Sequence, residues 1–249
     1  MSFKERLAAD EVLGGMLCAI PSAVVTQAVA AAGADFVLID GEHGPIGRET
    51  MHAMVAATAG TRCAPLVRVP GVLEPDVKTA LDAGAEGVVY PLIRSAEDAE
   101  RAVSFSTYPP AGTRGWGPFA AHSRHGVAIG DYLGEIGPRI TCALLIETVE
   151  AVERIDAILA VPGIDLAIVA QFDLSTALGA HGRFDAPELL DAVARVERAA
   201  KAAGIPLGTS ALTAEQSRAA VASGYRVLIH GFDVLMLKQQ VAAFRDWTA

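Results

Sequence analysis

The chain has 249 residues and a formal net charge of −9 at pH 7; 52% of its residues are hydrophobic and 20% are charged. This negative balance argues against nucleic acid or an anionic membrane surface as a partner. No apolar run reaches the roughly 18 residues that a membrane helix needs. Charges of both signs near Met1 do not suit a signal peptide, so we expect a cytoplasmic protein. Cys18, Cys63 and Cys142 lie in separate apolar runs, and we expect buried free thiols.

Apolar runs of strand length alternate with alanine-rich segments of helical period. The runs predict eight strands, at Gly15–Ile20, Phe36–Ile39, Ala64–Val69, Gly87–Pro91, Thr141–Glu147, Leu166–Phe172, Pro206–Ser210 and Arg226–Phe232. The segments between them predict helices at Ser22–Ala32, Arg48–Ala59, Glu74–Ala83, Ala96–Phe105, Ala151–Leu159, Ala186–Ala203 and Ala214–Ser223. This alternation is typical of a (β/α)8 TIM barrel, and we predict that residues 1–249 form one such domain. A doubly wound open sheet is the alternative, but no Gly-x-Gly-x-x-Gly follows the first strand.

Two segments interrupt this alternation. Ser106–Arg139 shows no clear helix or strand and contains Tyr108-Pro-Pro-Ala-Gly-Thr-Arg114-Gly. Connections of this length in compact domains are usually functional, so we expect a lid or an oligomer contact there. The final segment, Val234–Ala249, predicts an amphipathic helix that either closes the barrel or packs on a neighbouring subunit.

Polar residues follow several of the expected strands at their carboxyl ends. Because these ends meet on one face of a parallel barrel, we expect their side chains to surround a single pocket. The residues placed there are Asp40, Glu42, His43, Arg68, Glu147 and Asp173.

The chemistry of these side chains suggests their roles. Glu147 and Asp173 follow successive strands without a basic neighbour, which favours a divalent cation, although each taken alone could simply cap a helix. Arg68 offers a planar fork for a carboxylate or phosphate of the substrate. His43 is the histidine placed to move a proton near neutral pH.

Five segments resemble the HpcH/HpaI aldolase family, the class II pyruvate-type aldolases. They are Asp40-Gly-Glu-His-Gly-Pro45, Val67-Arg-Val-Pro70, Tyr108-Pro-Pro-Ala-Gly-x-Arg114-Gly, Ile146-Glu-Thr148 and Asp173-Leu-Ser175. The resemblance runs over nearly the whole chain in matching order. It implies a barrel of the phosphoenolpyruvate/pyruvate type that acts on a 2-oxo acid and an aldehyde. It also implies a homohexamer built as a dimer of trimers.

The resemblance also implies residue roles. Glu147 and Asp173 would hold Mg²⁺, Mn²⁺ or Co²⁺, which chelates the donor, while Arg68 polarises the keto oxygen. His43 would act as the base or position it, paired with Asp82. Our element boundaries put Asp82 at the end of a helix on the opposite face, so either a neighbouring subunit supplies it or that boundary is displaced.

Further substrate contacts are expected at Asp40, Gln171, Phe172 and Ser123. The family usually has Gly-Pro-x-Asp-Leu-Ser, where this chain has Ala170-Gln-Phe-Asp173, and a glutamine of the family is replaced by Leu145. Both departures change the donor pocket and leave room for a donor other than pyruvate, such as hydroxypyruvate.

Three functions fit these residues. The first is a metal-dependent aldolase; no lysine ends a strand, so a Schiff-base route lacks its nucleophile. The second is a citrate-lyase-like carbon–carbon lyase acting on a CoA thioester, although the acidic chain shows no basic cluster for the CoA phosphates. The third is a non-catalytic barrel that binds a keto acid, but binding alone does not require a base at His43.

Overall fold

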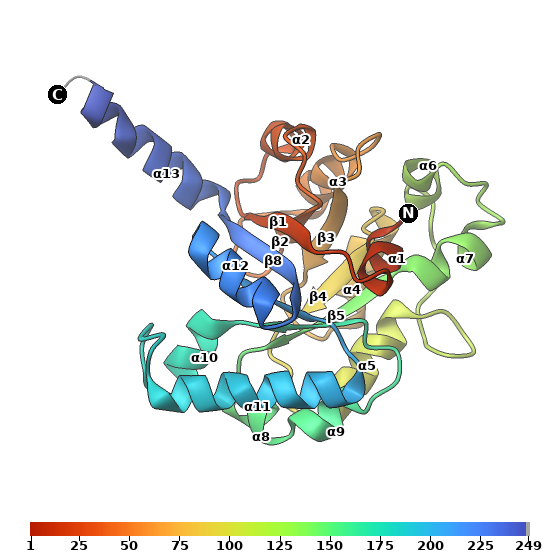
Figure 1. Cartoon of the computed structure of the whole chain (residues 1–249). Helices are drawn as coiled ribbons and strands as arrows, with labels where there is room; N and C mark the ends of the chain where they lie inside the picture. The colour runs from red at the N-terminus through yellow and green to blue at the C-terminus, as the bar shows by residue number, and fades with distance from the viewer. Residues whose placement is uncertain (248–249) are drawn as a thin grey trace.

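The computed structural model describes residues 1–247, apart from the side chain of Asp246. Its eight strands are parallel and close into a barrel in sequence order, with the last strand beside the first (Figure 1). The strands are β1 (Leu13–Cys18), β2 (Phe36–Asp40), β3 (Ala64–Arg68), β4 (Gly87–Tyr90), β5 (Thr141–Ile146), β6 (Leu166–Val169), β7 (Leu207–Ser210) and β8 (Tyr225–Phe232). The predicted (β/α)8 barrel is confirmed.

Helices connect consecutive strands on the outside of the barrel. They are α2 (Ala23–Ala31), α3 (Arg48–Ala56), α4 (Glu74–Asp82), α5 (Ala96–Ser106), α8 (Val149–Glu153), α9 (Ile155–Leu159), α10 (Gln171–Ala177), α11 (Pro187–Ala203) and α12 (Ala214–Ala222). Ser22, Ser95, Thr148 and Thr213 begin four of them, and each side chain accepts a hydrogen bond from the backbone N–H three residues on. These caps satisfy donors that the first turn of a helix leaves unpaired.

The apolar core has two layers. Inside the barrel, alternate strand residues such as Leu38, Leu66 and Ile168 pack together. A larger layer fills the space between the strands and the helices, and it includes Val37, Val67 and Met54. Full burial of each such side chain contributes about 1.5–3 kcal/mol. The three cysteines are buried and free, as predicted.

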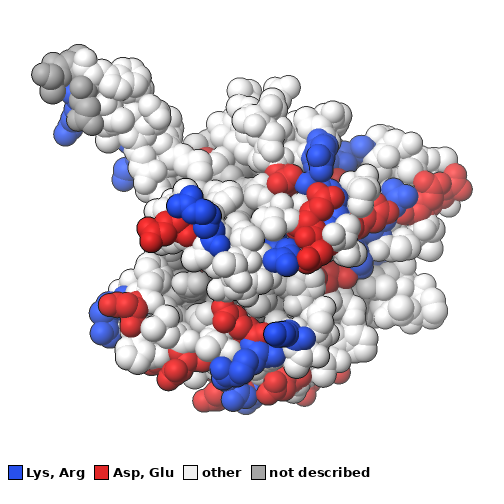
Figure 2. Space-filling view, viewed as in Figure 1, with Lys and Arg blue, Asp and Glu red and all other residues white. Residues whose placement is uncertain are grey.

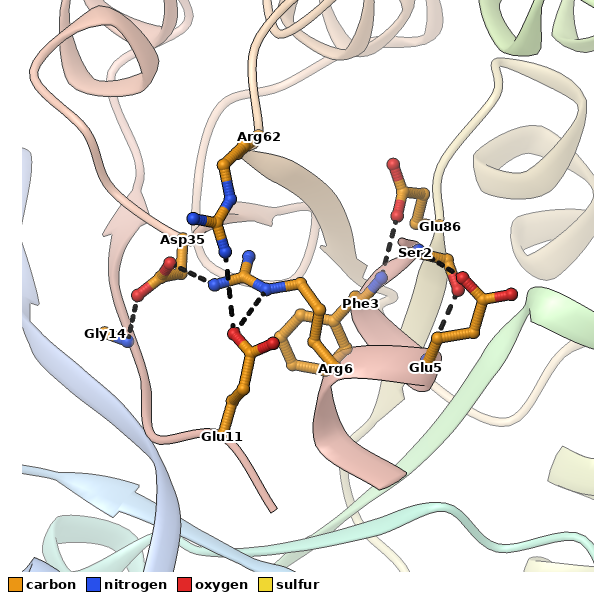
Figure 3. Close-up of polar contacts among 9 residues, drawn as sticks. All are labelled: Ser2, Phe3, Glu5, Arg6, Glu11, Gly14, Asp35, Arg62 and Glu86. Atoms are coloured by element: carbon orange, nitrogen blue, oxygen red, sulfur yellow. Dashed lines mark hydrogen bonds and ion pairs between the residues drawn. The ribbon is translucent and has the colours of Figure 1, made fainter. Parts of the chain in front are cut away.

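A short helix that the sequence analysis missed, α1 (Phe3–Ala8), packs Phe3 and Leu7 against the side chains of the barrel interior. Figure 3 shows its polar contacts. Ser2 and Glu5 form a reciprocal capping box at its start. Phe3 packs edge-on against Phe36, and the buried Arg6 pairs with Asp35 and with Glu11. This end of the barrel is therefore plugged, and the opposite face remains open for a site.

The expected boundaries of two segments were wrong. The sixth strand ends at Val169 because its pairing with β7 stops at Thr209, so Gln171 begins α10 instead of extending the strand to Phe172. Residues 106–139 contain α6 (Ala121–His125), α7 (Tyr132–Glu135) and the 3₁₀ turn η1 (Gly137–Arg139). Helices of three to five residues are too short to show a helical period in the sequence.

The helix after β8, α13 (Asp233–Ala243), points away from the barrel and does not close it (Figure 1). A 3₁₀ turn, η2 (Phe244–Trp247), follows it, and the last two residues of the predicted helix lie outside the described residues. The visible surface of α13 carries few charges, whereas charges of both signs are interspersed over the barrel (Figure 2). None of the helices within residues 1–247 is both long and apolar enough to span a membrane.

Candidate active site

Asp40 and Arg68 lie side by side at the carboxyl ends of β2 and β3, where they are paired in register. The Arg68 guanidinium donates two hydrogen bonds to the Asp40 carboxylate, from Nε at 3.0 Å and from Nη2 at 2.8 Å. Asp40 is 2% exposed and also accepts bonds from the backbone N–H groups of Glu42 and His43. Burial raises the pKa of Asp40, but the bonds and charge of Arg68 outweigh it and hold this pKa below its usual value. Both oxygens of Asp40 are thus occupied within the chain.

Glu42 extends this pair into a cluster. Its Oε2 lies 3.1 Å from Arg68 Nη1 but makes no hydrogen bond, and its side chain is 12% exposed. Burial raises the pKa of Glu42 more than the charge of Arg68 lowers it. His43 is exposed, with Nε2 3.8 Å from the same Glu42 oxygen. The histidine is therefore free to reorient toward the open face.

Glu147 directly follows β5 and is 6% exposed. Its Oε1 accepts a 2.5 Å hydrogen bond from the backbone N–H of Leu92, a residue with a φ of 58°. Burial, together with the negative charges of Asp173 and Glu42, raises the pKa of Glu147 to about 7, although the Leu92 bond and Arg68 oppose this shift. The structure therefore brings Glu147 into the same electrostatic cluster as Glu42, Asp173 and Arg68.

Asp173 lies exposed in the first turn of α10, at the mouth of a pocket that Arg68 and Phe172 also line. The Gln171 amide donates to Thr209 Oγ1 at 3.2 Å, which ties the start of α10 to β7. Phe172 is 48% exposed and packs edge-on against Phe184. Three of the predicted residues, Arg68, Phe172 and Asp173, thus meet around one opening, whereas Gln171 lines an adjoining cavity.

The donor set fits an open divalent-cation site. Within residues 1–247, no three His, Cys, Asp or Glu side chains are grouped closely enough to enclose a metal on their own. Mg²⁺ is commonly held by one or two carboxylates, with water and substrate oxygens completing its shell. Glu147 and Asp173 offer two such carboxylates, and the unsatisfied Glu42 oxygen adds negative charge beside them.

Two predicted site residues lie elsewhere in the chain. Asp82 ends α4, which returns toward the amino end of the barrel, and its nearest cation is Arg114, at 3.5 Å. Ser123 is exposed in α6 and bonds to the ring of its neighbour His122. Neither residue lines the pocket at the carboxyl ends of the strands. Asp82 ends α4 at the opposite end of the barrel from His43, which follows β2, so a single chain does not pair these two residues.

The sequence analysis missed two features of this site. The backbone of Leu92, just after β4, orients Glu147, and Phe232 at the end of β8 lines the pocket. Leu92 follows β4 and Phe232 ends β8, and both side chains are apolar. The carboxyl ends of all eight strands meet on one face, including those with apolar residues. Applying this rule to β4 and β8 would have predicted both features.

Charged side chains gathered at the carboxyl ends of the strands define a (β/α)8 barrel enzyme. The sequence model of the HpcH/HpaI aldolase/citrate lyase family matches residues 15–239, so the chain belongs to this family. It is 34% identical to a hydroxypyruvate/pyruvate aldolase of Roseovarius nubinhibens over 242 residues, which cover 96% of this chain and 93% of the relative. A 2-keto-3-deoxy-L-rhamnonate aldolase of Escherichia coli is 30% identical, with 98% of this chain and 93% of the relative covered.

A solved structure agrees with this assignment. The crystal structure of a family member from Burkholderia cenocepacia has a TM-score of 0.91 and 32% sequence identity, and the match covers 99% of this chain and 98% of that one. With named aldolases related along nearly its full length, the chain is an enzyme of the carbon–carbon lyase class.

Proposed function

We propose that this enzyme is a divalent-metal-dependent, class II aldolase. It cleaves or forms 4-hydroxy-2-oxo acids, with pyruvate or hydroxypyruvate as donor and an aldehyde as acceptor. The main support for this proposal is the position of Arg68. The buried Asp40 holds its guanidinium by two hydrogen bonds, and the carboxylates of Glu147 and Asp173 belong to the same cluster. The names of the two relatives, a hydroxypyruvate/pyruvate aldolase and a keto-deoxy-sugar-acid aldolase, support the same chemistry.

Glu147 and Asp173 are the residues that would hold the cation. When bound, the cation supplies Lewis-acid polarisation of the donor keto oxygen. The Leu92 N–H fixes one oxygen of Glu147, and the charges of Asp173, Glu42 and Arg68 act on the same carboxyl group. Burial and the nearby carboxylates of Asp173 and Glu42 raise the pKa of Glu147, and a bound cation would favour its ionised form.

Arg68 would stabilise the charge that develops during cleavage. As the C3–C4 bond of the substrate breaks, its electron pair moves to C3 and is delocalised onto the C2 oxygen. A guanidinium already held in place by Asp40 meets that charge without reorganising. His43 would take the proton from the C4 hydroxyl, and its exposed position lets it reach a bound substrate.

We also propose that the enzyme is a homo-oligomer in which α13 packs on a second copy. Apolar residues recur on α13 and η2 at helical spacing and are exposed: Val234, Leu237, Val241 and Phe244 are 40%, 58%, 52% and 43% exposed. A projecting helix with such a stripe leaves apolar surface in water unless another chain covers it.

The proposal is tested by two treatments of the purified enzyme. Removal of metal with EDTA should abolish pyruvate aldol formation, and addition of Mg²⁺, Mn²⁺ or Co²⁺ should restore it. Borohydride added with pyruvate should leave the intact mass unchanged, because none of the described residues that line the pocket is a lysine. Full activity after EDTA treatment, or a pyruvate-sized mass adduct, would refute the class II assignment.

A further inference from the structure

The pocket at the mouth of the barrel has two chemically different sides. Arg68 on β3 and Asp173 at the start of α10 are the only charged side chains among the described residues that line it. Leu38, Leu145 and Ile168, which belong to the barrel interior, form its floor.

The other side of the pocket comes from β7, β8 and β1. In an eight-stranded barrel β7 is four strands from β3, so this side faces Arg68 across the barrel. It carries Leu17, Leu212, Ile229 and Phe232, with Ser210 as its polar side chain. Leu212 and Phe232 are 41% and 40% exposed, and Phe172 is 48% exposed beside them. Large apolar side chains thus stand open to water where a substrate would enter.

A β-bulge places Phe232 on this wall. Between β1 and β8 the pairing runs from Gly15 with Ile229 to Leu17 with Phe232, so β8 uses one more residue than β1 over this stretch. Gly231 has a φ of 119°, in the left-handed region that favours glycine. Ile229 points into the barrel, and strict alternation would send Phe232 outward. The bulge instead brings its ring to the pocket, the kind of redirection that bulges provide near active sites.

The same wall offers little to a polar acceptor. Among the described residues that line the pocket, Arg68 is the one cation, and it is already bonded to Asp40 and lies beside Glu42. A distal carboxylate of an acceptor would therefore find no positive partner among the described lining residues of the wall. A hydroxyl group of a sugar chain would lose water against these apolar side chains, and Ser210 is the polar side chain of this part of the lining.

We infer that this enzyme prefers aldehyde acceptors with an apolar body, aliphatic or aromatic, and that Phe232 and Leu212 select them. The inference rests on the proposed aldolase function, in which Arg68, Glu147 and Asp173 bind the donor. The acceptor then lies toward β7, β8 and β1, with its aldehyde carbon near the donor and its body against the apolar wall.

The test compares kcat/KM for four aldehydes with pyruvate as the fixed donor. Hexanal and benzaldehyde represent apolar bodies, glyceraldehyde a polyhydroxylated one, and succinic semialdehyde one with a distal carboxylate. We expect kcat/KM for the apolar pair to exceed that for the other two by at least about tenfold, the discrimination typical of a hydrophobic pocket. A preference for glyceraldehyde or succinic semialdehyde would overturn the inference.

Variants then connect the preference to the wall. Phe232→Ser, and independently Leu212→Ser, should lower kcat/KM for benzaldehyde about tenfold and leave that for glyceraldehyde unchanged or higher. Leu190→Ser, which removes a 54% exposed leucine on α11 away from the pocket, is the matched control. Selectivity unchanged in both wall variants would refute the role of the wall.

A separate readout distinguishes this inference from the aldolase proposal. Exchange of pyruvate C3 protons in D₂O needs no acceptor, so wild-type enzyme and the Leu190→Ser control should both show it, whichever acceptor is preferred. If wild-type exchange occurs but polar acceptors are preferred, the acceptor inference fails and the aldolase proposal stands. If wild-type enzyme shows no exchange with pyruvate or hydroxypyruvate, the aldolase proposal itself fails.

Discussion

Asp40 is a buried carboxylate whose partner is Arg68, and the two residues depend on each other. Removing one partner of such a pair leaves an uncompensated charge in a poorly solvated place, which is far costlier than removing both. The sequence predicted both residues at the pocket. It did not show that Asp40 is enclosed behind Arg68, because side-chain burial depends on the register of β2 against β3.

Arg68→Ala should lower the free energy of unfolding by about 3–5 kcal/mol, because Asp40 would remain buried without its partner. The double variant Asp40→Ala with Arg68→Ala should cost clearly less than the sum of the single variants. Urea denaturation of the four proteins completes the cycle. Strictly additive losses would mean that the pair does not act as a unit.

Substitutions at Glu147 and Asp173 separate function from stability. Glu147→Gln and Asp173→Asn should each reduce metal-dependent aldol formation by at least about 100-fold, because each replaces a carboxylate of the proposed metal site with a neutral amide. The metal-free Glu147→Gln protein should melt at or above the wild-type temperature, because burial and the neighbouring carboxylates penalise the Glu147 charge.

Glu150→Gln is the control for these two variants, since Glu150 is an exposed carboxylate in α8 just after Glu147. It should leave both activity and melting temperature unchanged. Wild-type activity in Glu147→Gln or Asp173→Asn would remove that residue from the metal site.

At the level of elements, the strands were predictable because both of their faces are buried. Continuous aliphatic runs such as Val37–Ile39 and Leu144–Ile146 mark them unambiguously. The end of β6 was not predictable, since Phe172 prolongs the apolar run although its side chain belongs to the pocket. The helix α1 begins with the capping box of Ser2 and Glu5, a local signal that the sequence analysis overlooked. The helices α6 and α7 are held by tertiary contacts, such as the bond from Arg124 to Glu86, that no local pattern reveals.

His125 in α6 predicts a pH dependence of stability. Burial, together with the charges of Arg124, Arg114 and Arg139, lowers its pKa from 6.5 to about 4. A histidine whose folded-state pKa is depressed contributes stability above its unfolded pKa, and this contribution is lost as the pH falls from 6.5 toward 4. The drop in melting temperature between pH 7 and pH 4.5 should therefore be smaller in His125→Gln than in wild type.

The exposed His52 of α3 provides the comparison for that experiment. His52→Gln should show the wild-type pH dependence, which differential scanning calorimetry can record. Equal slopes for wild type and His125→Gln would show that His125 protonates without cost in the folded protein.

At the scale of the whole molecule, the barrel brings together residues that are far apart in sequence. Arg68, Glu147 and Asp173 could be placed on one face from the sequence, because strand ends of a parallel barrel have a fixed location. The positions of Asp82 and Ser123 away from that face follow from the direction of α4 and the packing of α6. The direction of α13 could not be predicted, because an apolar helical stripe fits the same barrel or another chain equally well.

If α13 packs on a second copy, charges on its apolar stripe should disrupt the assembly. Leu237→Glu and Val241→Glu should shift the protein to a smaller species in size-exclusion chromatography with light scattering. Gln239→Glu adds the same charge at an exposed polar position of α13 and should leave the mass unchanged. A wild-type protein that elutes as a monomer would contradict this assembly.

The most direct test of the central claim is the exchange of pyruvate C3 protons in D₂O, followed by NMR. The experiment tests whether the enzyme converts pyruvate to its enolate at the cluster of Arg68, Glu147 and Asp173. It requires no knowledge of the acceptor. We predict no exchange after EDTA treatment, restoration by Mg²⁺, Mn²⁺ or Co²⁺, and loss of the restored exchange in Glu147→Gln. Exchange that is indifferent to metal, or that persists in Glu147→Gln, would contradict the metal-dependent mechanism.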